Sequence, residues 1–597
     1  MCLKATRVFL VLFCCALFLP VKVAFAGPVR LALSNYAPPG ERNVGFIDAV
    51  TTTDGGLGVL TSGEAEGQPR LRLTRYDARG IRNWSRTILI PSPVVETGEN
   101  LRQASLLATH DGNLLVLSQR SSTSDAPAVT VDIVGRVFDP MGTVVANRGL
   151  APIPVNRDGV QVNFETAQAV LGKDGFIWMT ANGNVTETNA GVFAFFCFDP
   201  RLNLEAFSMI SGRIEKNYEF YRRSLGIAPS AKSGITITAQ DTYREFLAGK
   251  IVVTESVYVF SGYKWETEVL YNGLDERLKT YEVEGSSPGP MYFYKGFDAA
   301  VSGDLSLLTI TSMDPKEQEP RWSTLAVHDD STWIYPNLLD WREYTPTNSH
   351  HVEPLPDGGF LFATPLRDSD VLIEWTKRIP AELDESGRAI AAVAELRLPA
   401  SPKDPWLLRS LQTSEAGTGY LAAGSSVDGK ESLGISMAKI RSPKGAEEGA
   451  IVWQLAQTPK SPFVAKKLLP TLGDKVFAVG VNAEGIIGMQ LFQEPEFFRG
   501  VNVPIQQVFG GMETVFRLIL NKPAPDGGYP VRLSFDSKRF RGIPAQVTIP
   551  AGETVYEGAF EVLPSARLGL STITARGDLK IDKVTTVHTA TLEVMSK

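Results

Sequence analysis

The sequence has few cysteines for its length. Four occur among 597 residues, and three of them, Cys2, Cys14 and Cys15, lie before residue 27. The fourth, Cys197, stands in an apolar run that is typical of a buried strand. A single cysteine cannot form an intramolecular disulfide. If the first 26 residues are removed, packing alone must hold the fold.

Basic side chains are not in excess either. Lys and Arg number 59 against 66 Asp and Glu, which gives a formal net charge of −7. Because nucleic acids and anionic membrane surfaces attract basic proteins, we predict neither as a partner. At 597 residues the chain is too long for one hydrophobic core, so we expect two or more.

Residue patterns that carry enzyme chemistry are also scarce. His351 and Glu353 could share one face of a strand, but two ligands are too few for a metal site. Residues 285–289 have nucleophile-elbow spacing, yet prolines follow them instead of a helix. Residues 424–430 lack the Ser or Thr that a phosphate loop needs after its Lys. We predict no catalytic residue, metal or cofactor, although carboxylate pairs for glycoside hydrolysis have no recognisable spacing.

The chain begins with a predicted export signal. Lys4 and Arg7 supply positive charge, and the apolar run Val8–Leu19 is too short to span a bilayer. Small residues mark the expected cleavage site, which comprises Ala24, Ala26 and Gly27, the first residue of the mature chain. We predict no membrane span in that mature chain.

Export and the scarcity of cysteine together indicate a compartment. Large secreted eukaryotic proteins usually carry several disulfides, whereas this mature chain would keep only Cys197. We therefore predict a bacterial protein of the periplasm, the cell surface or the extracellular space.

The clearest pattern is a repeat of turns, without helical periodicity between them. Asp-Gly pairs stand between apolar runs, and such a pair predicts a β-hairpin with a two-residue turn in which both residues have positive φ. The pairs are Asp54-Gly55, Asp111-Gly112, Asp174-Gly175 and Asp357-Gly358, with weaker counterparts at Ser233-Gly234, Ser302-Gly303, Gly417-Thr418-Gly419 and Gly473-Asp474.

A second turn follows each strong Asp-Gly pair. It consists of an apolar residue, an aspartate, two further residues and usually a glycine. The copies are Tyr76–Gly80, Phe138–Gly142 and Leu383–Gly387, with Phe198–Leu202 as a degenerate copy. Two hairpins per unit predict four strands per unit.

Four-stranded units in tandem predict a β-propeller of seven or eight blades over residues 27–495, preceded by the signal at 1–26. The last unit is one strand short, and residues 30–33 could complete it and close the ring. Two or three separate sandwiches are the alternative. The runs Gly80–Trp84 and Gly449–Trp453 resemble the blade endings of outer-membrane assembly lipoproteins and quinoprotein dehydrogenases. This resemblance implies the propeller fold and no activity.

Residues 500–597 predict a different domain of short strands and regular turns. The segments Leu520–Gly528 and Pro544–Gly552 resemble the immunoglobulin-like modules of bacterial surface and secreted proteins. The resemblance implies a spacer or docking unit. The predicted fold is thus all-β, with a propeller followed by an immunoglobulin-like sandwich whose core holds Val531, Leu533, Phe535, Val547 and Ile549.

Basic residues precede the first turn in six of the units. These positions start the expected innermost strands, whose ends surround the channel of a propeller. The residues are Arg102, Arg223, Lys295, His351, Arg409 and Lys467. A basic ring there would suit an anionic ligand or an acidic partner segment, and scattered loop charges are the alternative.

The favoured function is a non-enzymatic binding or scaffold protein of the envelope or cell surface, with a protein partner. A carbohydrate is a further candidate ligand. The alternatives are a secreted propeller hydrolase or lyase acting on polysaccharide, and an adhesin, because fold alone does not decide function.

Overall fold

In a computed structural model of the protein, the described part of the chain forms β-strands, β1 to β43. This confirms the predicted all-β class. In the same part of the chain no helix has the length and apolarity to cross a bilayer. The structure describes residues 29–595 except 90–103, 122–130, 152–161, 186–190, 212, 216–217, 230–233, 248–249, 266–267, 285–293, 303–304, 314–319, 329–330, 336–350, 356–358, 366–370, 377–393, 399–405, 415–417, 428–429, 432–434, 442–449, 458–463, 474, 483, 494–496, 506, 579–580 and 582–586.

The chain divides into a ring unit, Ala32–Phe492, and a C-terminal unit that contains Gln493–Lys597. Each sheet of the ring unit is built mainly from strands that follow one another in the chain, and strands that are neighbours in this order pair in the antiparallel direction. The first two sheets are β2 (Arg42–Thr51), β3 (Leu57–Ala65), β4 (Gln68–Tyr76) and β5 (Arg82–Leu89), then β6 (Ala104–Ala108), β7 (Leu114–Ser121), β8 (Val131–Phe138) and β9 (Val144–Ala151).

The next sheet has nine strands, because one parallel bridge between β13 and β18 joins two antiparallel runs. The first run is β10 (Val162–Leu171), β11 (Ile177–Val185), β12 (Gly191–Phe198) and β13 (Leu204–Ser211). The second run is β14 (Arg213–Glu215), β15 (Tyr218–Pro229), β16 (Ile235–Leu247), β17 (Lys250–Trp265) and β18 (Glu268–Glu284).

The remaining sheets of the ring unit follow in the same manner. They are β19 (Tyr294–Ser302), β20 (Leu305–Met313), β21 (Pro320–His328) and β22 (Ser331–Tyr335), then β23 (His351–Pro354), β24 (Phe360–Pro365), β25 (Val371–Thr376) and β26 (Ala394–Leu398). Next come β27 (Trp406–Thr413), β28 (Thr418–Val427), β30 (Ile435–Arg441) and β31 (Ala450–Gln457), with β29 (Lys430–Glu431) beside β28. The last sheet is β32 (Val464–Thr471), β33 (Lys475–Val481), β34 (Ile487–Gln493) and β1 (Val29–Tyr36).

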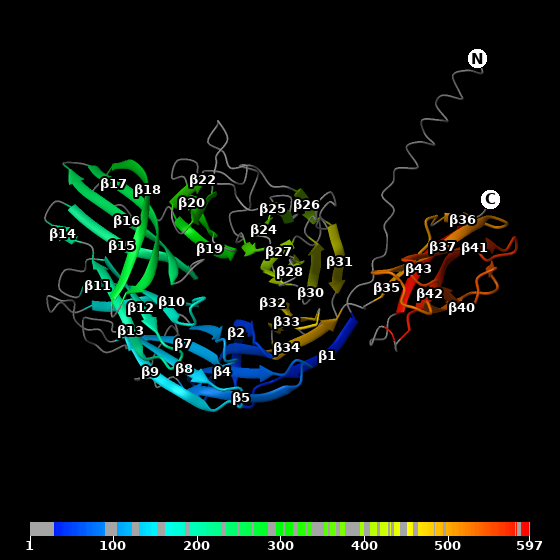
Figure 1. Ribbon diagram of the computed structural model, residues 1–597, viewed down its shortest axis with the longest axis horizontal. Helices are drawn as coiled ribbons and strands as arrows, with labels where there is room; N and C mark the ends of the chain where they lie inside the picture. Colours follow the sequence, from blue (N-terminus) through cyan, green and yellow to red (C-terminus); the bar gives the residue numbers. More distant parts are fainter. Residues whose placement is uncertain are drawn as a thin grey trace, which may run out of the picture. The chain divides into compact units, whose positions relative to one another are not determined.

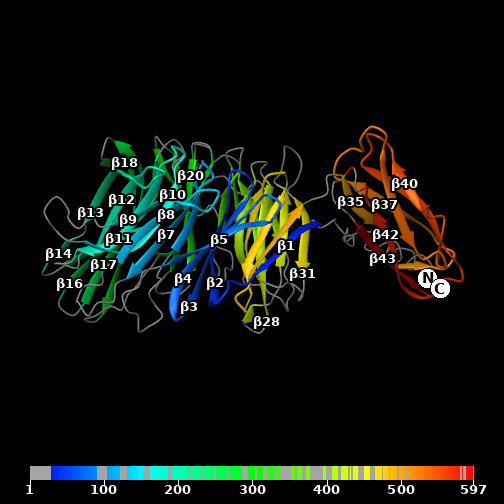
Figure 2. The ribbon, with the colours of Figure 1, turned by 90° about the horizontal axis from the view of Figure 1, so that it is seen from below.

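The sheets form a closed ring around their inner strands. We use this term for β2, β6, β10, β15, β19, β23, β27 and β32. Each inner strand contacts the next one, and β32 contacts β2 (Figure 1). Figure 2 shows the ring unit from below, with β13 and β16 on one side, β2 to β5 near the middle and β31 on the other side. The arrangement is propeller-like, and β1 pairs with β34 as residues 30–33 were expected to do.

Hydrophobic cores lie between successive sheets of the ring unit. Leu60 and Leu71 of the first sheet pack with Leu106 and Leu114 of the second. The opposite face of β3 packs on the last sheet through Leu57 and Val59, in a cluster with Phe477 and Met489, among others. Successive side chains of a strand point to opposite faces, so each sheet contributes to two cores.

The hairpins at Asp54-Gly55, Asp111-Gly112 and Asp174-Gly175 are confirmed, but the predicted turn type is wrong. Gly55 N donates to Thr52 O (2.8 Å) and Thr52 N donates to Gly56 O (3.0 Å). This pattern is a three-residue loop in which only the glycine has positive φ. The pair Asp357-Gly358 lies outside the described residues.

The second turns at Asp77, Asp139 and Asp199 share one geometry, built on the aspartate, and the copy Leu383–Gly387 lies outside the described residues. Asp77 Oδ1 accepts hydrogen bonds from the backbone N–H groups of Arg79 and Ile81, both at 2.9 Å. Asp199 accepts the equivalent pair, and burial raises its pKa less than these hydrogen bonds lower it, so the pKa lies below its usual value. In the degenerate copy, Leu202 adopts φ +64° where the other copies have glycine.

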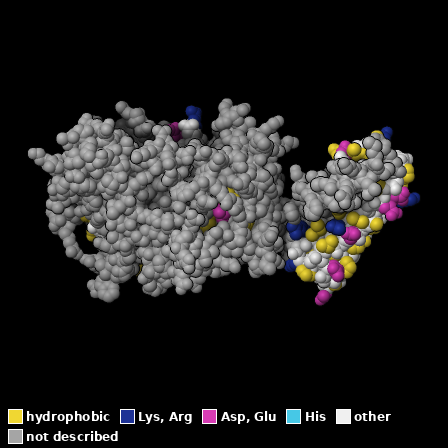
Figure 3. Space-filling model, turned by 90° about the horizontal axis from the view of Figure 1, so that it is seen from above, with side chains coloured by type: hydrophobic (Ala, Val, Ile, Leu, Met, Phe, Trp, Pro, Cys, Tyr) yellow, Lys and Arg dark blue, Asp and Glu magenta, His cyan; other side chains and the backbone are white. Residues whose placement is uncertain are grey.

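The C-terminal unit consists of two sheets packed on a shared core. One sheet is β35 (Phe498–Asn502), β37 (Glu513–Leu520), β41 (Val555–Val562) and β39 (Phe540–Arg541); the other is β36 (Gln507–Phe509), β43 (Val587–Met595), β42 (Gly569–Arg576), β38 (Tyr529–Phe535) and β40 (Gln546–Ile549). The predicted residues Val531, Leu533, Val547 and Ile549 are buried in this core, and Phe535 packs against it. Figure 3 shows hydrophobic side chains of this unit between acidic and basic ones.

Cys197, the cysteine that lies among the described residues, is structural. Cys197 lies on β12, is fully buried and has a free thiol. Burial raises the pKa of this thiol to about 12. The thiolate is therefore not available at neutral pH, which fits the predicted buried strand.

Candidate functional site

The predicted basic residues lie on the inner strands as far as the structure describes them. Arg223, Lys295, His351, Arg409 and Lys467 belong to β15, β19, β23, β27 and β32. Arg102 and the expected cleavage residues Ala24, Ala26 and Gly27 lie outside the described residues.

Two of these residues are the extra residues of β-bulges. The strand register shifts between Tyr294 and Gly296, which leaves Lys295 unpaired, and between Leu408 and Ser410, which leaves Arg409 unpaired. A bulge adds one residue to one strand and breaks the alternation of faces. The face of Lys295 and Arg409 therefore could not be read from strand alternation in the sequence.

Buried and partly exposed side chains alternate on parts of two inner strands. On β2, Ala49 is buried, whereas Asp48 and Val50 on either side are partly exposed. On β23, Val352 is buried, whereas His351 and Glu353 are partly exposed. The inner strands contact one another around the ring, and we call their partly exposed side chains the inner wall.

An ion pair joins the last inner strand to the first. Lys467 Nζ lies 2.9 Å from Asp48 Oδ1, and the two side chains are 24% and 27% exposed. Asp48 Oδ1 also accepts the Ala49 N–H at 2.8 Å, which fixes the carboxylate against its own strand. The predicted cation Lys467 thus has a carboxylate partner that was not foreseen.

A second polar contact links β23 to β27. Gln412 Nε2 donates to Glu353 Oε1 (2.9 Å) and to Leu411 O (2.7 Å). Between β27 and β32, the buried Ser410 Oγ accepts the Leu468 N–H at 3.1 Å. We call Asp48, His351, Glu353, Gln412 and Lys467 the polar arc of the inner wall.

Beyond β2 the inner strands carry exposed side chains of both kinds. Val50 on β2, Leu107 on β6 and Val170 on β10 are partly exposed, and each packs against a core between sheets. Ser105 on β6 is partly exposed as well, and Gln168 on β10 is exposed.

His351 and Glu353 do occupy one face of β23, as their spacing predicted. Within the described residues, however, no group of three or more His, Cys, Asp or Glu side chains gathers where it could hold a metal ion. A third oxygen or nitrogen ligand from the protein is what a metal site would need there.

Asp48 and Gln412 were not among the residues predicted from the sequence. A signal for the first was present, because Asp48 and His351 both stand six residues before the aspartate of an Asp-Gly pair. Gln412 has no such marker, since the glycine-rich turn after it differs from the Asp-Gly pattern.

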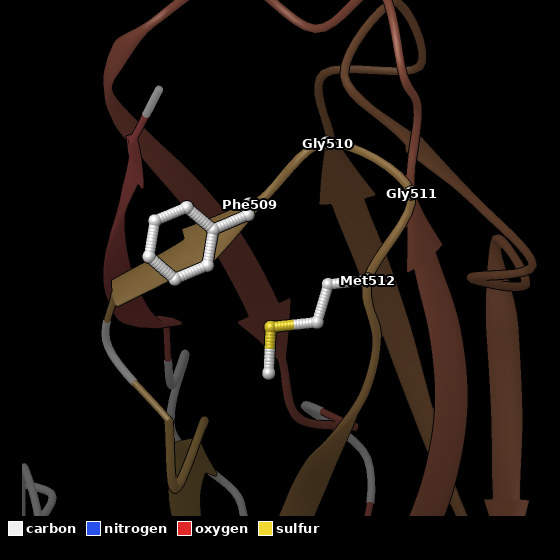
Figure 4. Close-up of a pocket in the computed structure, with 4 residues that line it drawn as sticks. All are labelled: Phe509, Gly510, Gly511 and Met512. Atoms are coloured by element: carbon white, nitrogen blue, oxygen red, sulfur yellow. The ribbon is translucent and has the colours of Figure 1, made fainter. Parts of the chain in front are cut away.

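A hollow of about 390 Å³ lies in the C-terminal unit. It is lined by Phe509, Gly510, Gly511 and Met512, where β36 leads into β37. Figure 4 shows the Phe509 ring and the Met512 side chain extending to the same side of this connection. These four residues carry no ionisable side chain, so the hollow offers apolar contact and no acid–base chemistry.

Comparisons with known proteins give structural neighbours only. No protein-family model matches the chain, and neither does any curated protein. The β-propeller domain of the Trilobed protease from Pyrococcus furiosus is 10% identical, with a TM-score of 0.33, 69% of this chain covered and 95% of that one. Penicillium chrysogenum α-L-arabinanase is 10% identical, with a TM-score of 0.27 and coverages of 55% and 90%. Pyrococcus horikoshii acylaminoacyl peptidase is 10% identical, with a TM-score of 0.31 and coverages of 78% and 60%.

Proposed function

We propose that the protein is a non-enzymatic binding or scaffold protein of the bacterial cell envelope or surface. The observation that carries this proposal is the inner wall, where polar side chains from different sheets hold one another by hydrogen bonds and an ion pair. Side chains that are held by such contacts have fewer conformations to lose, so less conformational entropy is lost when a partner binds. The ring is the binding platform, and its partner is a protein of the same compartment.

The platform is a propeller of eight blades. Each inner strand begins one blade, so β15–β18 count as a blade although β18 bridges to β13. The last blade takes β1 as its outer strand. Closure of this kind removes two exposed sheet edges, which supports a stable platform.

The C-terminal unit is an immunoglobulin-like sandwich that acts as a spacer or assembly module. Its sheet orders, β35-β37-β41-β39 and β36-β43-β42-β38-β40, place strands from earlier and later parts of the unit in each sheet. Short β36 runs parallel to the last strand β43. Two such sheets over one core match the layout of immunoglobulin-like domains.

The predicted export signal and the cysteine content support this location. An export signal over residues 1–26 would deliver a mature chain with one buried thiol, Cys197. Such a chain folds without disulfide chemistry, which suits the periplasm, the cell surface or the exterior.

The test is affinity purification of the full-length tagged protein from the envelope of its host, after mild cross-linking. We expect a protein partner in constant ratio, absent from the same preparation of untagged protein. Recovery of no partner, together with cleavage of oligosaccharides by the purified protein, would contradict the proposal and support a polysaccharide hydrolase or lyase.

A further inference from the structure

Two arginines stand directly opposite one another on the outer face of the C-terminal unit. Arg532 on β38 pairs with Arg576 on the antiparallel neighbour β42, and both side chains are exposed. The next pair on that face, Ser534 with Thr574, is polar and uncharged. Because like charges directly opposite one another destabilise a sheet, folding alone does not favour this arrangement.

No carboxylate relieves the repulsion within the described part of the unit. There, neither Arg532 nor Arg576 forms an ion pair or a side-chain hydrogen bond. Arg517 on the other sheet, in contrast, is paired with Glu557 at 2.7 Å. A guanidinium group offers a planar set of N–H donors that fits a carboxylate. The two arginines therefore form a positive surface that suits an acidic ligand.

An edge strand lies beside this pair. Strand β40 is the last strand of its sheet and pairs with β38 alone. Gln546 on β40 is the partner of Arg532, so that Gln546, Arg532 and Arg576 form one row across three strands. The row leads from the open edge of the sheet to the arginine pair.

The backbone groups of Gln546 and Thr548 point toward that open edge. Leu533 N donates to Ala545 O at 2.8 Å, and bonded and non-bonded pairs alternate along an antiparallel ladder. Thr548 with Pro530 and Gln546 with Arg532 are therefore non-bonded pairs, and Pro530 has no N–H to donate. The N–H and C=O groups of Gln546 and Thr548 are thus directed away from β38 and are open to another strand.

This edge selects the kind of acidic ligand. An extended peptide can pair with alternating N–H and C=O groups, whereas an acidic sugar or a phosphate ion lacks a matching backbone. A strand added to β40 would lie about 10 Å from β38, which a glutamate and Arg532 can bridge together. Pro544 and Pro550 flank β40 and cannot donate to a ladder, so the paired segment is short, about four residues.

We propose that the β40 edge and the arginine pair bind an extended acidic segment of a protein partner. The segment pairs with Gln546 and Thr548 through its backbone, and a carboxylate on the arginine face binds Arg532. Arg576 adds to the positive potential that attracts the segment. This inference rests on the assembly role proposed for the C-terminal unit and names the chemistry of the partner.

The experiment is titration of the full-length protein with a capped seven-residue peptide of alternating glutamate and valine. The counterparts are the same peptide with lysine in place of glutamate, and hexagalacturonate as an acidic saccharide. We expect the glutamate peptide to bind and both counterparts to bind at least about ten-fold more weakly. No binding of the glutamate peptide, or equal binding of hexagalacturonate, would overturn the inference.

Two variants test the two halves of the surface. Arg576→Glu places opposite charges face to face, so it should weaken peptide binding about ten-fold or more and yet increase the protection of β38 and β42 from hydrogen–deuterium exchange. Thr548→Pro removes a donor from the open edge without breaking a bond to β38, and it should also weaken binding. Unchanged binding in either variant would contradict the proposed contact.

The matched control is Arg567→Glu. Arg567 is exposed and precedes β42, so this variant makes the same change of charge away from the arginine pair. It should bind the glutamate peptide as the unchanged protein does. An equal loss in Arg567→Glu and Arg576→Glu would show that net charge alone governs binding and would overturn the site.

The outcomes separate this inference from the proposed function. An envelope partner recovered in the same ratio with Arg576→Glu leaves the scaffold function standing and removes the arginine face from it. Binding of the glutamate peptide without any envelope partner does the reverse, because it keeps the docking chemistry and contradicts the scaffold function.

Discussion

The ring unit and the C-terminal unit both stack β-sheets without a disulfide, but they distribute their cores differently. In the ring unit, separate clusters lie between successive sheets, and polar contacts cross between those sheets. The C-terminal unit gathers its buried residues in one cluster between two sheets. A destabilising substitution in the ring unit should therefore affect mainly one pair of sheets, whereas one in the core of the C-terminal unit should destabilise the whole unit.

The largest expected effect is in the single core. Phe516 on β37 is fully buried and packs near Tyr556 and Phe560. Phe516→Ala should cost the C-terminal unit about 3–5 kcal/mol, through lost burial and a cavity. Hydrogen–deuterium exchange should then rise throughout this unit and stay unchanged in β3 and β7. Leu570→Ala, at a position 71% exposed, is the control and should have little effect.

A smaller effect is expected where polar contacts join sheets of the ring. Arg75 is 1% exposed and donates to Asp54 Oδ2 (2.8 Å) on its own sheet and to Gly112 O (2.9 Å) on the next. Arg75→Leu should cost about 1–3 kcal/mol, because a buried carbonyl loses its donor.

The readout for Arg75→Leu is exchange in the turns at Gly55 and Gly112, which should rise while β37 stays protected. Arg79→Ala provides the comparison, since its pair with Asp77 is exposed on the arginine side. Equal effects of both substitutions would mean that the crossing contact is no stronger than a surface ion pair.

Leu202 sharpens the comparison within the ring unit. Its φ of +64° is strained for leucine, yet the side chain is 2% exposed and lies in the core between the second and third sheets. Leu202→Gly removes about 1–2 kcal/mol of strain but loses burial worth about 2–4 kcal/mol, so a net loss of about 1–2 kcal/mol is expected. Urea unfolding of the ring unit measures it, and a gain in stability would show that strain outweighs burial.

The smallest expected effect depends on pH. Hydrogen bonds to the Asp199 carboxylate hold its pKa below the usual value, so its stabilising contribution is present at neutral pH. That contribution is lost as the pH falls below about 4 and through the folded-state pKa. Asp199→Asn should change the free energy of unfolding at pH 7 by less than about 1 kcal/mol. It should also reduce the loss of stability that the ring unit shows at acidic pH.

Asn482 supports this expectation, because it accepts the same two backbone hydrogen bonds with a neutral side chain. The stability of the Asp199→Asn variant and of the unchanged protein should be compared by thermal unfolding between pH 3 and 7. An unchanged loss of stability at acidic pH would show that other carboxylates are responsible for the pH dependence.

Local signals made much of the fold predictable. The Asp-Gly pairs located three hairpins, because glycine at positive φ is a requirement of the turn itself. The turn type was wrong because two-residue and three-residue loops use the same residues, and the choice depends on strand register. The alternation of Val531 and Leu533 located the core of the C-terminal unit.

The candidate site was much less predictable. Asp48 and Lys467 are 419 residues apart, so no local pattern reveals their contact. The bulges at Lys295 and Arg409 shift the register by one residue, and alternation alone cannot place side chains beyond such a shift. The polar arc therefore depends on contacts between distant parts of the chain, which the composition of the sequence does not reveal.

The pairing of β1 with β34 also sets an order of events in time. A ribosome makes β1 first and β34 after nearly all of the ring, so the outer strand of the last sheet waits for its partner throughout synthesis. The long separation of β1 and β34 in the sequence lowers the equilibrium stability only slightly, since each doubling of a loop's length adds only about 0.6 kcal/mol to the free energy of closing it. It slows folding instead, because contacts between distant residues form late. A nascent chain that stops before residue 487 would hold every earlier sheet and still have an open ring.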